Sequence, residues 1–261
     1  MPKNRITILG CGTSTGVPRI FCRCPVCRSK NPKNHRLRAS AWIEMNGIHL
    51  LIDTSTDLRL QAIRARIPRI DAILYTHPHA DHLHGIDEIR SFNIIQNEVI
   101  PAYGNAWTCQ ELRTRFGYIL DTEKQHPGGG APRVALHEIT PHSHPFQVKN
   151  LTIQAIPLRH GSQETLAYRI DHVAYVTDCS YVPKQSLDQL QDLSVLVLDC
   201  LQLEPHRTHL NLDQALEVVT HVKPRKTVLT HMGHDFDYSV WRKRLPKGVE
   251  LAYDGMKLKL E

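Results

Sequence analysis

The amino-acid sequence predicts an α/β fold. Apolar runs with strand character alternate with segments whose capping residues and spacing predict helices. Several strand-like runs end directly at a histidine or an aspartate. A dense group of metal-capable side chains at residues 77–82 lies between a strand-like run and a helix start. These patterns together predict a sheet that displays polar side chains at its strand ends.

The predicted strands are short apolar runs, some alternating and some continuous. In order they are residues 5–9, 38–45, 48–53, 72–75, 99–104, 151–158, 166–170, 173–176, 195–198, 227–230, 251–253 and 256–258. Asn46-Gly47 joins two of these runs and predicts a β-hairpin. Asp254-Gly255 predicts a second hairpin between the last two runs.

Capping residues and apolar spacing predict the helices. In order they are a helix through Leu58, Leu60, Ile63 and Ile67 that stops at Pro68, one starting within residues 83–90, one over residues 106–120, one carrying residues 215–219 and capped by Asn211 or Asp213, and one through Trp241. Residues 125–132 predict a loop, and the prolines around His142 and His144 predict a surface turn.

Composition and charge exclude several classes of protein. Apolar content of 41% and charged content of 22% are ordinary for a soluble globular protein. No run approaches the ~18 apolar residues of a membrane helix, and the first residues lack the apolar core of a secretory signal. The formal charge of +6 favours phosphate-bearing ligands, but no block of like charges indicates a nucleic-acid-binding tail. We therefore expect a cytoplasmic protein with no membrane partner.

The sequence His77-Pro78-His79-Ala80-Asp81-His82 places four metal-capable side chains within six residues. Successive side chains of an extended strand point to opposite sides, so a strand could not bring all four together, whereas a turn can. We predict two adjacent metal ions, with His77 and His79 on one and Asp81 and His82 on the other. Imidazole and carboxylate ligands suit zinc, manganese or iron. The alternative is a polar loop that is merely rich in histidine.

Later residues argue against that alternative. His160, Asp178 and His231 each lie just past a strand-like run, as His77 does. Loops at strand ends are where a rigid sheet presents catalytic groups. Four such residues in equivalent settings predict that they lie together at one edge of the fold.

The seven cysteines include a close group, Cys22, Cys24 and Cys27. The odd number and the lack of a secretory signal argue for a reducing compartment. Three thiols at this spacing can close around one zinc ion, with a fourth ligand from elsewhere in the chain. We therefore predict a zinc-binding loop at about residues 21–28. The alternative is a set of unrelated buried thiols.

With these residues the chain resembles the metallo-β-lactamase superfamily, whose fold is an αββα sandwich. The resemblance covers nearly the whole chain and implies a single hydrolase domain over residues 1–261. It implies one metal held by His77, His79 and His160, and a second held by Asp81, His82 and His231. It further implies that Asp178 bridges the two metals together with a hydroxide, and that Asp53 orients the ligands from behind.

Within the superfamily the chain resembles the cyclic-phosphate phosphodiesterases of phosphonate degradation. Those enzymes carry the cysteine loop and a histidine three residues after the last catalytic ligand, here His234, which would complete a structural zinc site. They also carry a histidine before an Asn-capped helix, here His209, which acts as the catalytic acid. His206 is the competing candidate, and Arg207 is one candidate for holding a second phosphate.

This resemblance implies a dinuclear zinc or manganese enzyme with one structural zinc. Its expected reaction opens 5-phosphoribosyl 1,2-cyclic phosphate to ribose 1,5-bisphosphate, with His209, Asp81 and Asp178 as catalytic residues. The expected partner is a small phosphorylated molecule and not a nucleic acid, and a homodimer is allowed.

Four alternatives stay open. A transfer-RNA 3′-processing endonuclease shares the metal ligands but needs a long basic arm, which the sequence does not show. A cyclic-nucleotide phosphodiesterase would use the same site. A glyoxalase-type thiolesterase leaves the cysteine loop unexplained. A zinc-stapled binding protein would not need the intact ligand set.

Overall fold

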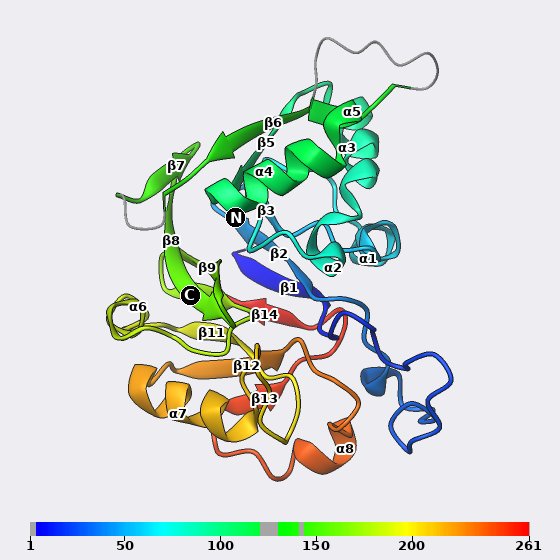
Figure 1. Cartoon of the computed structure of the whole chain (residues 1–261), viewed down its shortest axis with the longest axis vertical. Helices are drawn as coiled ribbons and strands as arrows, with labels where there is room; N and C mark the ends of the chain where they lie inside the picture. The colour runs from blue at the N-terminus through cyan, green and yellow to red at the C-terminus, as the bar shows by residue number, and fades with distance from the viewer. Residues whose placement is uncertain (1–3, 121–129, 141–143, 261) are drawn as a thin grey trace.

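The computed structural model describes residues 4–120, 130–140 and 144–260. Two seven-stranded sheets pack against each other, and helices cover their outer faces (Figure 1). This arrangement confirms the predicted α/β fold and the αββα sandwich that the resemblance implies. Among the described helices, none is long and apolar enough to cross a membrane.

The first sheet is antiparallel at one side and parallel at the other. Across the sheet its strands are β14 (Lys257–Lys259), β1 (Arg5–Gly10), β2 (Ser40–Met45), β3 (Ile48–Ile52), β4 (Ala72–Leu74), β5 (Ile100–Gly104) and β6 (Val134–Glu138). The strands from β3 to β6 run parallel, and β1 pairs antiparallel with both of its neighbours. Parallel pairs need crossover connections, which the helices supply.

The second sheet has the same mixed character. Across the sheet its strands are β13 (Val249–Leu251), β12 (Lys226–Thr230), β11 (Val195–Asp199), β10 (Val173–Val176), β9 (Gln163–Ile170), β8 (Leu151–His160) and β7 (Phe146–Val148). The strands from β10 to β13 run parallel, and β7 to β10 are antiparallel.

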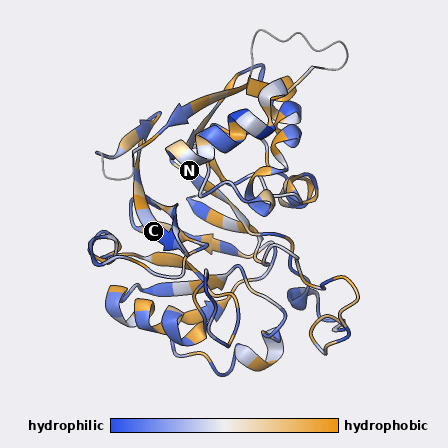
Figure 2. Cartoon of the chain, viewed as in Figure 1, coloured by the Kyte–Doolittle hydropathy of each residue, from blue (hydrophilic) through white to orange (hydrophobic). Residues whose placement is uncertain are grey.

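Two groups of helices cover the sandwich (Figure 1). Beside the first sheet lie α1 (Leu58–Ala65), α2 (Ala80–Leu83), α3 (Ile89–Gln96), α4 (Ala106–Arg115) and α5 (Gly117–Leu120), and beside the second lie α6 (Lys184–Asp188), α7 (Leu212–Val222) and α8 (Tyr238–Trp241). Two short 3-10 helices are η1 (Pro32–Asn34) and η2 (Ile86–Glu88). Figure 2 shows hydrophilic and hydrophobic residues mixed along these outer helices.

The first sheet is buried on both faces, as its apolar runs predict. On β2, Ile43 faces the core between the two sheets, while its neighbour Trp42 faces the core beneath α1 to α5. Leu50 and Leu51 of β3 divide in the same way. Alternation along a strand produces this division, because successive side chains point to opposite faces.

The hairpin at Asn46-Gly47 is confirmed. Its two turn residues have positive φ angles of 53° and 79°, as a tight turn between twisted strands requires. Asn211, rather than Asp213, caps α7, and its side chain accepts a hydrogen bond from the Gln214 amide.

The predicted hairpin at Asp254-Gly255 is wrong. The run before it, β13, pairs with β12 in the second sheet, and the run after it, β14, pairs with β1 in the first sheet. Residues 252–256 therefore cross between the sheets. The Asp254 carboxylate fixes this crossing by accepting hydrogen bonds from the amides of Cys11 and Leu37.

The first predicted helix is shorter than expected, and only some of its apolar residues are buried. It ends at Ala65, because Arg66 adopts a left-handed conformation and its amide donates back to Ala62 and Ile63. The packed positions are Leu58, Ala62 and Ala65. Leu60 and Ile63, which lie in the helix as predicted, are 56% and 61% exposed.

Other boundaries also differ from the prediction. The helix over residues 106–120 is two helices, which Phe116 separates, and an additional short helix, α2, lies within the metal motif itself. The helix predicted to start within residues 83–90 is confirmed, because α3 begins at Ile89. The last helix has only four residues. The strands β6 and β7 were not predicted. Most of the predicted loop at residues 125–132, and residues 141–143 of the predicted turn, lie outside the described residues.

Gly85 marks a close approach between α2 and the end of β3. A Cβ atom on Gly85 would lie 2.0 Å from the carbonyl oxygen of Ser55. We expect Gly85→Ala to lower the free energy of unfolding by about 1–3 kcal/mol, because backbone must move to relieve the overlap. Urea denaturation measures the change.

Gly117→Ala is the matched control, because a Cβ atom there has no atom within 4 Å. We expect a change of about 0.5 kcal/mol or less in that variant. Equal unfolding midpoints for Gly85→Ala and the unsubstituted protein would show that the approach is not tight.

Candidate metal centre

Strand ends and one short helix bring all seven predicted catalytic ligands together. His77 follows β4, His79 precedes α2, Asp81 and His82 lie in α2, His160 ends β8, Asp178 follows β10, and His231 follows β12. Asp178 and His231 have positive φ angles of 53° and 57°. Non-glycine residues adopt such angles at a cost, and they cluster at functional sites.

One group of ligand atoms contains His77, His79, His160 and Asp178, all within 4.8 Å of one another. The His77 Nε2 lies 2.8 Å from the His79 Nδ1 and 3.6 Å from an Asp178 oxygen. The His160 Nδ1–H donates to the carbonyl of Thr208 at 2.7 Å, which leaves its Nε2 unprotonated. Four ligand atoms therefore converge on one point.

The second group contains Asp81, His82 and His231. The Asp81 Oδ2 lies 3.3 Å from the His82 Nε2 and 3.5 Å from the His231 Nε2. Asp178 also reaches this group, at 3.3 Å from the His82 Nε2 and 3.4 Å from the His231 Nε2. Asp178 thus lies between the two groups, which is the position that a bridging ligand needs.

The residues fit a pair of cations. The His82 Nδ1–H donates to Asp53 at 2.7 Å, so its Nε2 carries a lone pair unless a second proton is bound. That buried Nε2 has no hydrogen-bond partner among the described residues, and it faces the carboxylates of Asp81 and Asp178. A lone pair facing two anions is repulsive, and a cation between them removes the repulsion.

The pKa values agree with this interpretation. Burial lowers the pKa of His77, His79 and His160, so these imidazoles are neutral, the form that binds metals. Burial would also lower the pKa of His82, but the carboxylates of Asp178, Asp81 and Asp53 together hold it well above its ordinary value. Without a metal, a proton on His82 takes the place that the cation would fill.

Asp53 orients one ligand of each group on the side away from the other ligands. Its carboxylate accepts hydrogen bonds from the amide and the hydroxyl of Thr76, each at 2.8 Å. The Thr76 hydroxyl in turn lies 3.0 Å from the His77 Nδ1 and can accept its proton. The buried Asp53 carboxylate thus orients His82 directly and His77 through Thr76, as the resemblance implies.

His209 lies inside this cluster and His206 lies outside it. The His209 Nε2 is 3.9 Å from an Asp178 oxygen, and its ring stacks on His231 at 4.7 Å. Burial alone would lower its pKa, but the Asp199 carboxylate, 3.3 Å from its Nδ1, raises that pKa to about 9. His206 is exposed, and partial burial and the nearby His209 lower its pKa.

Asp199 is a supporting residue that the sequence analysis did not assign. Besides holding His209, it accepts a hydrogen bond from the Leu210 amide and lies 3.6 Å from the His231 Nδ1. Its signal was present, because it ends a continuous buried strand just before Cys200, in the same setting as Asp178. It was left unassigned because it supplies no metal ligand.

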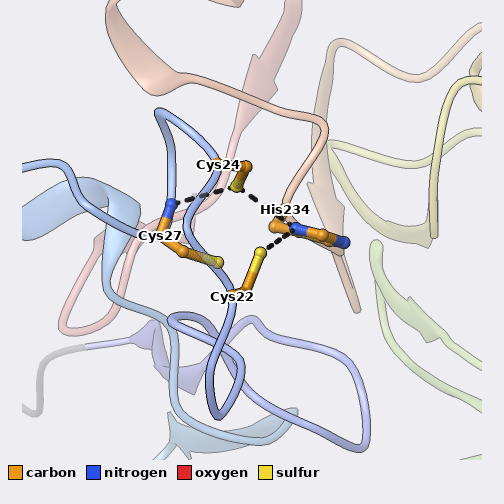
Figure 3. A group of neighbouring side chains, drawn as sticks. All are labelled: Cys22, Cys24, Cys27 and His234. Atoms are coloured by element: carbon orange, nitrogen blue, oxygen red, sulfur yellow. Dashed lines mark hydrogen bonds between the residues drawn. The ribbon is translucent and has the colours of Figure 1, made fainter.

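The cysteine loop forms a separate cluster with His234 (Figure 3). The Sγ atoms of Cys22 and Cys24 each lie 3.3 Å from the His234 Nδ1. Backbone amides of Cys27 and Arg19 point at the sulfurs of Cys24 and Cys27. Three thiolates and one imidazole are the donor set of a closed structural zinc site, and these four residues fit that ion.

Buried Arg36 holds the segment that carries both His231 and His234. Its guanidinium donates to the carbonyls of Gly233, at 2.9 Å, and Phe236. His231 and His234 lie on the same short segment, so one end of that segment faces each cluster. The cysteine cluster and Arg36 therefore fix the segment that carries His231.

Comparison with known proteins identifies the family. A model of the beta-lactamase superfamily domain matches residues 49–232 of the chain. A solved structure described as a new diphosphatase from the PhnP family is 37% identical and superposes with a TM-score of 0.91, over 99% of this chain and 97% of that one. The chain belongs to the metallo-β-lactamase superfamily. Within it, the identity over both whole chains places it in the PhnP family.

Two other similarities have a narrower meaning. An octanoyltransferase of Porphyromonas gingivalis is 32% identical over 255 residues, which are 97% of this chain and 51% of that protein. The chain thus spans about half the length of that relative. The short form of human tRNase Z superposes with a TM-score of 0.70 at 17% identity, over 98% and 99% of the two chains. That likeness shows the metallo-β-lactamase fold alone.

The cysteine cluster of this PhnP-family chain generates one prediction. We expect Cys24→Ser to lose about one zinc ion per chain and to unfold more easily, since one of four zinc ligands is weakened. The dinuclear centre should stay occupied in protein that remains folded. Metal content by mass spectrometry and thermal unfolding measure both effects.

Cys109→Ser is the control. Cys109 is buried and donates to the Gly104 carbonyl, which a serine hydroxyl can also do. Its zinc content should be unchanged. Unchanged zinc content in Cys24→Ser as well would refute a metal site in the cysteine loop.

The position of Asp178 generates a second prediction. We expect Asp178→Ala to keep the fold but to lose bound catalytic metal and more than about 100-fold of activity, the upper end for residues that only support a ligand. Asp178→Asn tests the charge without a change of size. Exposed Asp188→Ala serves as the control. Near-normal turnover with two bound metals in Asp178→Ala would exclude a bridging role.

Proposed function

We propose that the protein is a dinuclear-metal phosphodiesterase that opens a cyclic phosphate diester. The expected substrate is 5-phosphoribosyl 1,2-cyclic phosphate and the expected product is ribose 1,5-bisphosphate. The observation that carries the proposal is the place of His209, inside the ligand cluster and held by Asp199. Membership of the PhnP family supports it.

The two groups of ligands would hold two divalent ions, zinc or manganese. Bound there, such ions supply a water of lowered pKa and positive charge beside the phosphoryl oxygens. The chain itself supplies neutral imidazoles and carboxylates in fixed positions. Burial of these side chains, apart from exposed His79, limits the access of bulk water and strengthens the charge interactions inside the site.

His209 is the proton donor for the leaving group. Opening a cyclic diester expels an alkoxide, which leaves poorly without a proton. The His209 Nδ1–H is directed at Asp199, so its Nε2 faces the cluster and can carry the proton to be donated. Such an acid typically contributes 10²–10⁴-fold to the rate.

The pKa of His209, raised to about 9 beside Asp199, keeps the imidazole protonated at neutral pH. Two bound cations oppose this protonation, because positive charges repel. Activity on a cyclic alkyl phosphate should therefore decline as pH rises, with a midpoint below 9. Loss of the His209 proton lowers the rate only at alkaline pH. Any decline of the rate at acidic pH is therefore due to other groups.

A second candidate function is hydrolysis of a diphosphate. The 37% identical PhnP-family structure is described as a diphosphatase, and the similarity extends over nearly the whole of both chains. In a diphosphate the leaving group is itself a phosphate, which is much less basic than an alkoxide. The reaction would then depend less on His209.

A substrate panel with measured metal content tests the proposal. It contains cyclic ribose phosphate, 2′,3′- and 3′,5′-cyclic nucleotides, an inorganic and an organic diphosphate, and precursor transfer RNA. We expect cyclic ribose phosphate to give the highest kcat/KM. A preference for a diphosphate would replace the proposal with the second candidate, and no turnover of any phosphate ester or diphosphate by fully metallated protein would refute both.

His209→Ala tests the mechanism. We expect kcat to fall by about 10²-fold or more on a cyclic alkyl phosphate, but much less on bis(4-nitrophenyl) phosphate, whose phenolate leaves without a proton. Metal content should not change, because His209 is not proposed as a ligand. Steady-state kinetics on both substrates measure the difference.

His206→Ala is the paired control, because His206 is exposed on the same loop. It should change neither rate greatly. An equal loss on both substrates in His209→Ala would indicate a role in binding or metal assembly, and no loss on either would remove His209 from the mechanism.

A further inference from the structure

Trp107 borders the metal centre beside His79. Its ring centroid lies 6.0 Å from that of His79, with the two planes 88° apart. Trp107 is half-buried, and His79 is the only exposed member of its ligand group. Trp107 therefore lies at the mouth of the centre, where a bound substrate meets solvent.

The rings at this mouth form a row with Trp107 at one end. From Trp107 the row passes to His79, then to His160 at 5.1 Å, and then to His209 at 4.7 Å. Among the described residues, Trp107 has no ring contact with His209 itself. The tryptophan and the proposed acid are thus connected through His79 and His160, and they make no ring contact with each other.

The position of Trp107 is fixed by the ends of α4. Asn105 caps the helix by accepting a hydrogen bond from Thr108, and its side-chain amide donates to the Glu164 carbonyl at 3.1 Å. At the other end, Arg115 donates to the carbonyl of Pro78 at 2.8 Å, next to His79. Because both ends of α4 are held, Trp107 loses little conformational freedom when a ligand binds.

Trp107 differs in chemistry from the rest of the mouth. The ligand residues beside it are imidazoles and carboxylates, which suit metal and phosphate. An indole offers a wide apolar face, which suits the carbon skeleton of a substrate.

We propose that Trp107 is a specificity-determining residue that packs against the carbon skeleton of the substrate, which in a cyclic diester carries both the ester oxygen that stays on phosphorus and the one that leaves. The inference rests on the proposed function, in which His209 serves the group that leaves. The substrate class is then a phosphodiester whose retained group presents a flat face, such as a sugar ring or an aromatic base. A small alkyl group would leave the indole face without a stacking partner.

Two substrates with one leaving group isolate this contact. Bis(4-nitrophenyl) phosphate and methyl 4-nitrophenyl phosphate both release 4-nitrophenolate, and they differ only in the retained group. We expect the metallated protein to prefer the aryl ester by roughly tenfold in kcat/KM, mainly through KM, a typical effect of one aromatic stacking contact. Trp107→Ala should reduce the ratio strongly, to the value that the intrinsic reactivity of the two esters sets, and Trp107→Phe should restore most of it.

Trp241→Ala is the matched control, because Trp241 lies in α8, packs against Phe236 and has no contact with the ligand row. It should keep the ratio. An equal loss on both substrates in Trp107→Ala, or a loss of bound metal, would show that Trp107 merely supports His79 and would overturn the inference. An unchanged ratio would overturn it too.

A binding measurement separates this inference from the proposed function. Calorimetry compares phenylphosphonate with methylphosphonate on the metallated protein, and it requires no turnover. We expect a preference for the phenyl compound that disappears in Trp107→Ala. Suppose that neither ester is hydrolysed, but that the unsubstituted protein prefers the phenyl compound and Trp107→Ala does not. The proposed function then fails and the role of Trp107 stands. No preference in the unsubstituted protein refutes the role of Trp107.

Discussion

The structure of the site depends on one buried carboxylate among imidazoles. Asp178 lies within 3.3–3.9 Å of His77, His82, His209 and His231, which come from three separate parts of the chain. Burial opposes its charge, but His231 and His82 hold its pKa well below the ordinary value. Two other buried carboxylates, Asp53 and Asp199, hold the imidazoles from outside. The Asp178 carboxylate is thus surrounded by imidazole nitrogen atoms. The carboxylates of Asp53 and Asp199 fix the orientation of those imidazoles.

This arrangement explains which parts of the site could be predicted from the sequence. The ligands in residues 77–82 are close in sequence, so spacing alone predicts them. His160, Asp178 and His231 are distant but share one setting, the end of a strand, and parallel strands bring their ends to the same edge. His234 came from the resemblance, because no spacing rule joins it to Cys22 across the chain. Trp107 lies in a helix with no sequence signal for a site.

The differences between the sequence pattern and the fold have a common cause. Asp254-Gly255 has the local chemistry of a hairpin turn, but the partner of each flanking strand is decided by distant residues, β12 and β1. Leu60 and Ile63 are apolar, yet the face that α1 buries is set by the sheet beneath it. Local patterns predict where an element occurs, while packing between elements decides which face it buries and which neighbour it takes.

The crossing at residues 252–256 has a consequence for the order of folding. Because β14 lies beside β1, the first sheet has an open edge until residues 257–259 have been synthesised. During translation, β1 therefore presents unpaired backbone groups to its surroundings while β2 to β6 are already available to pair. The first sheet is thus completed only after the strands of the second sheet have been synthesised, and until then its edge at β1 is open to pairing with other chains.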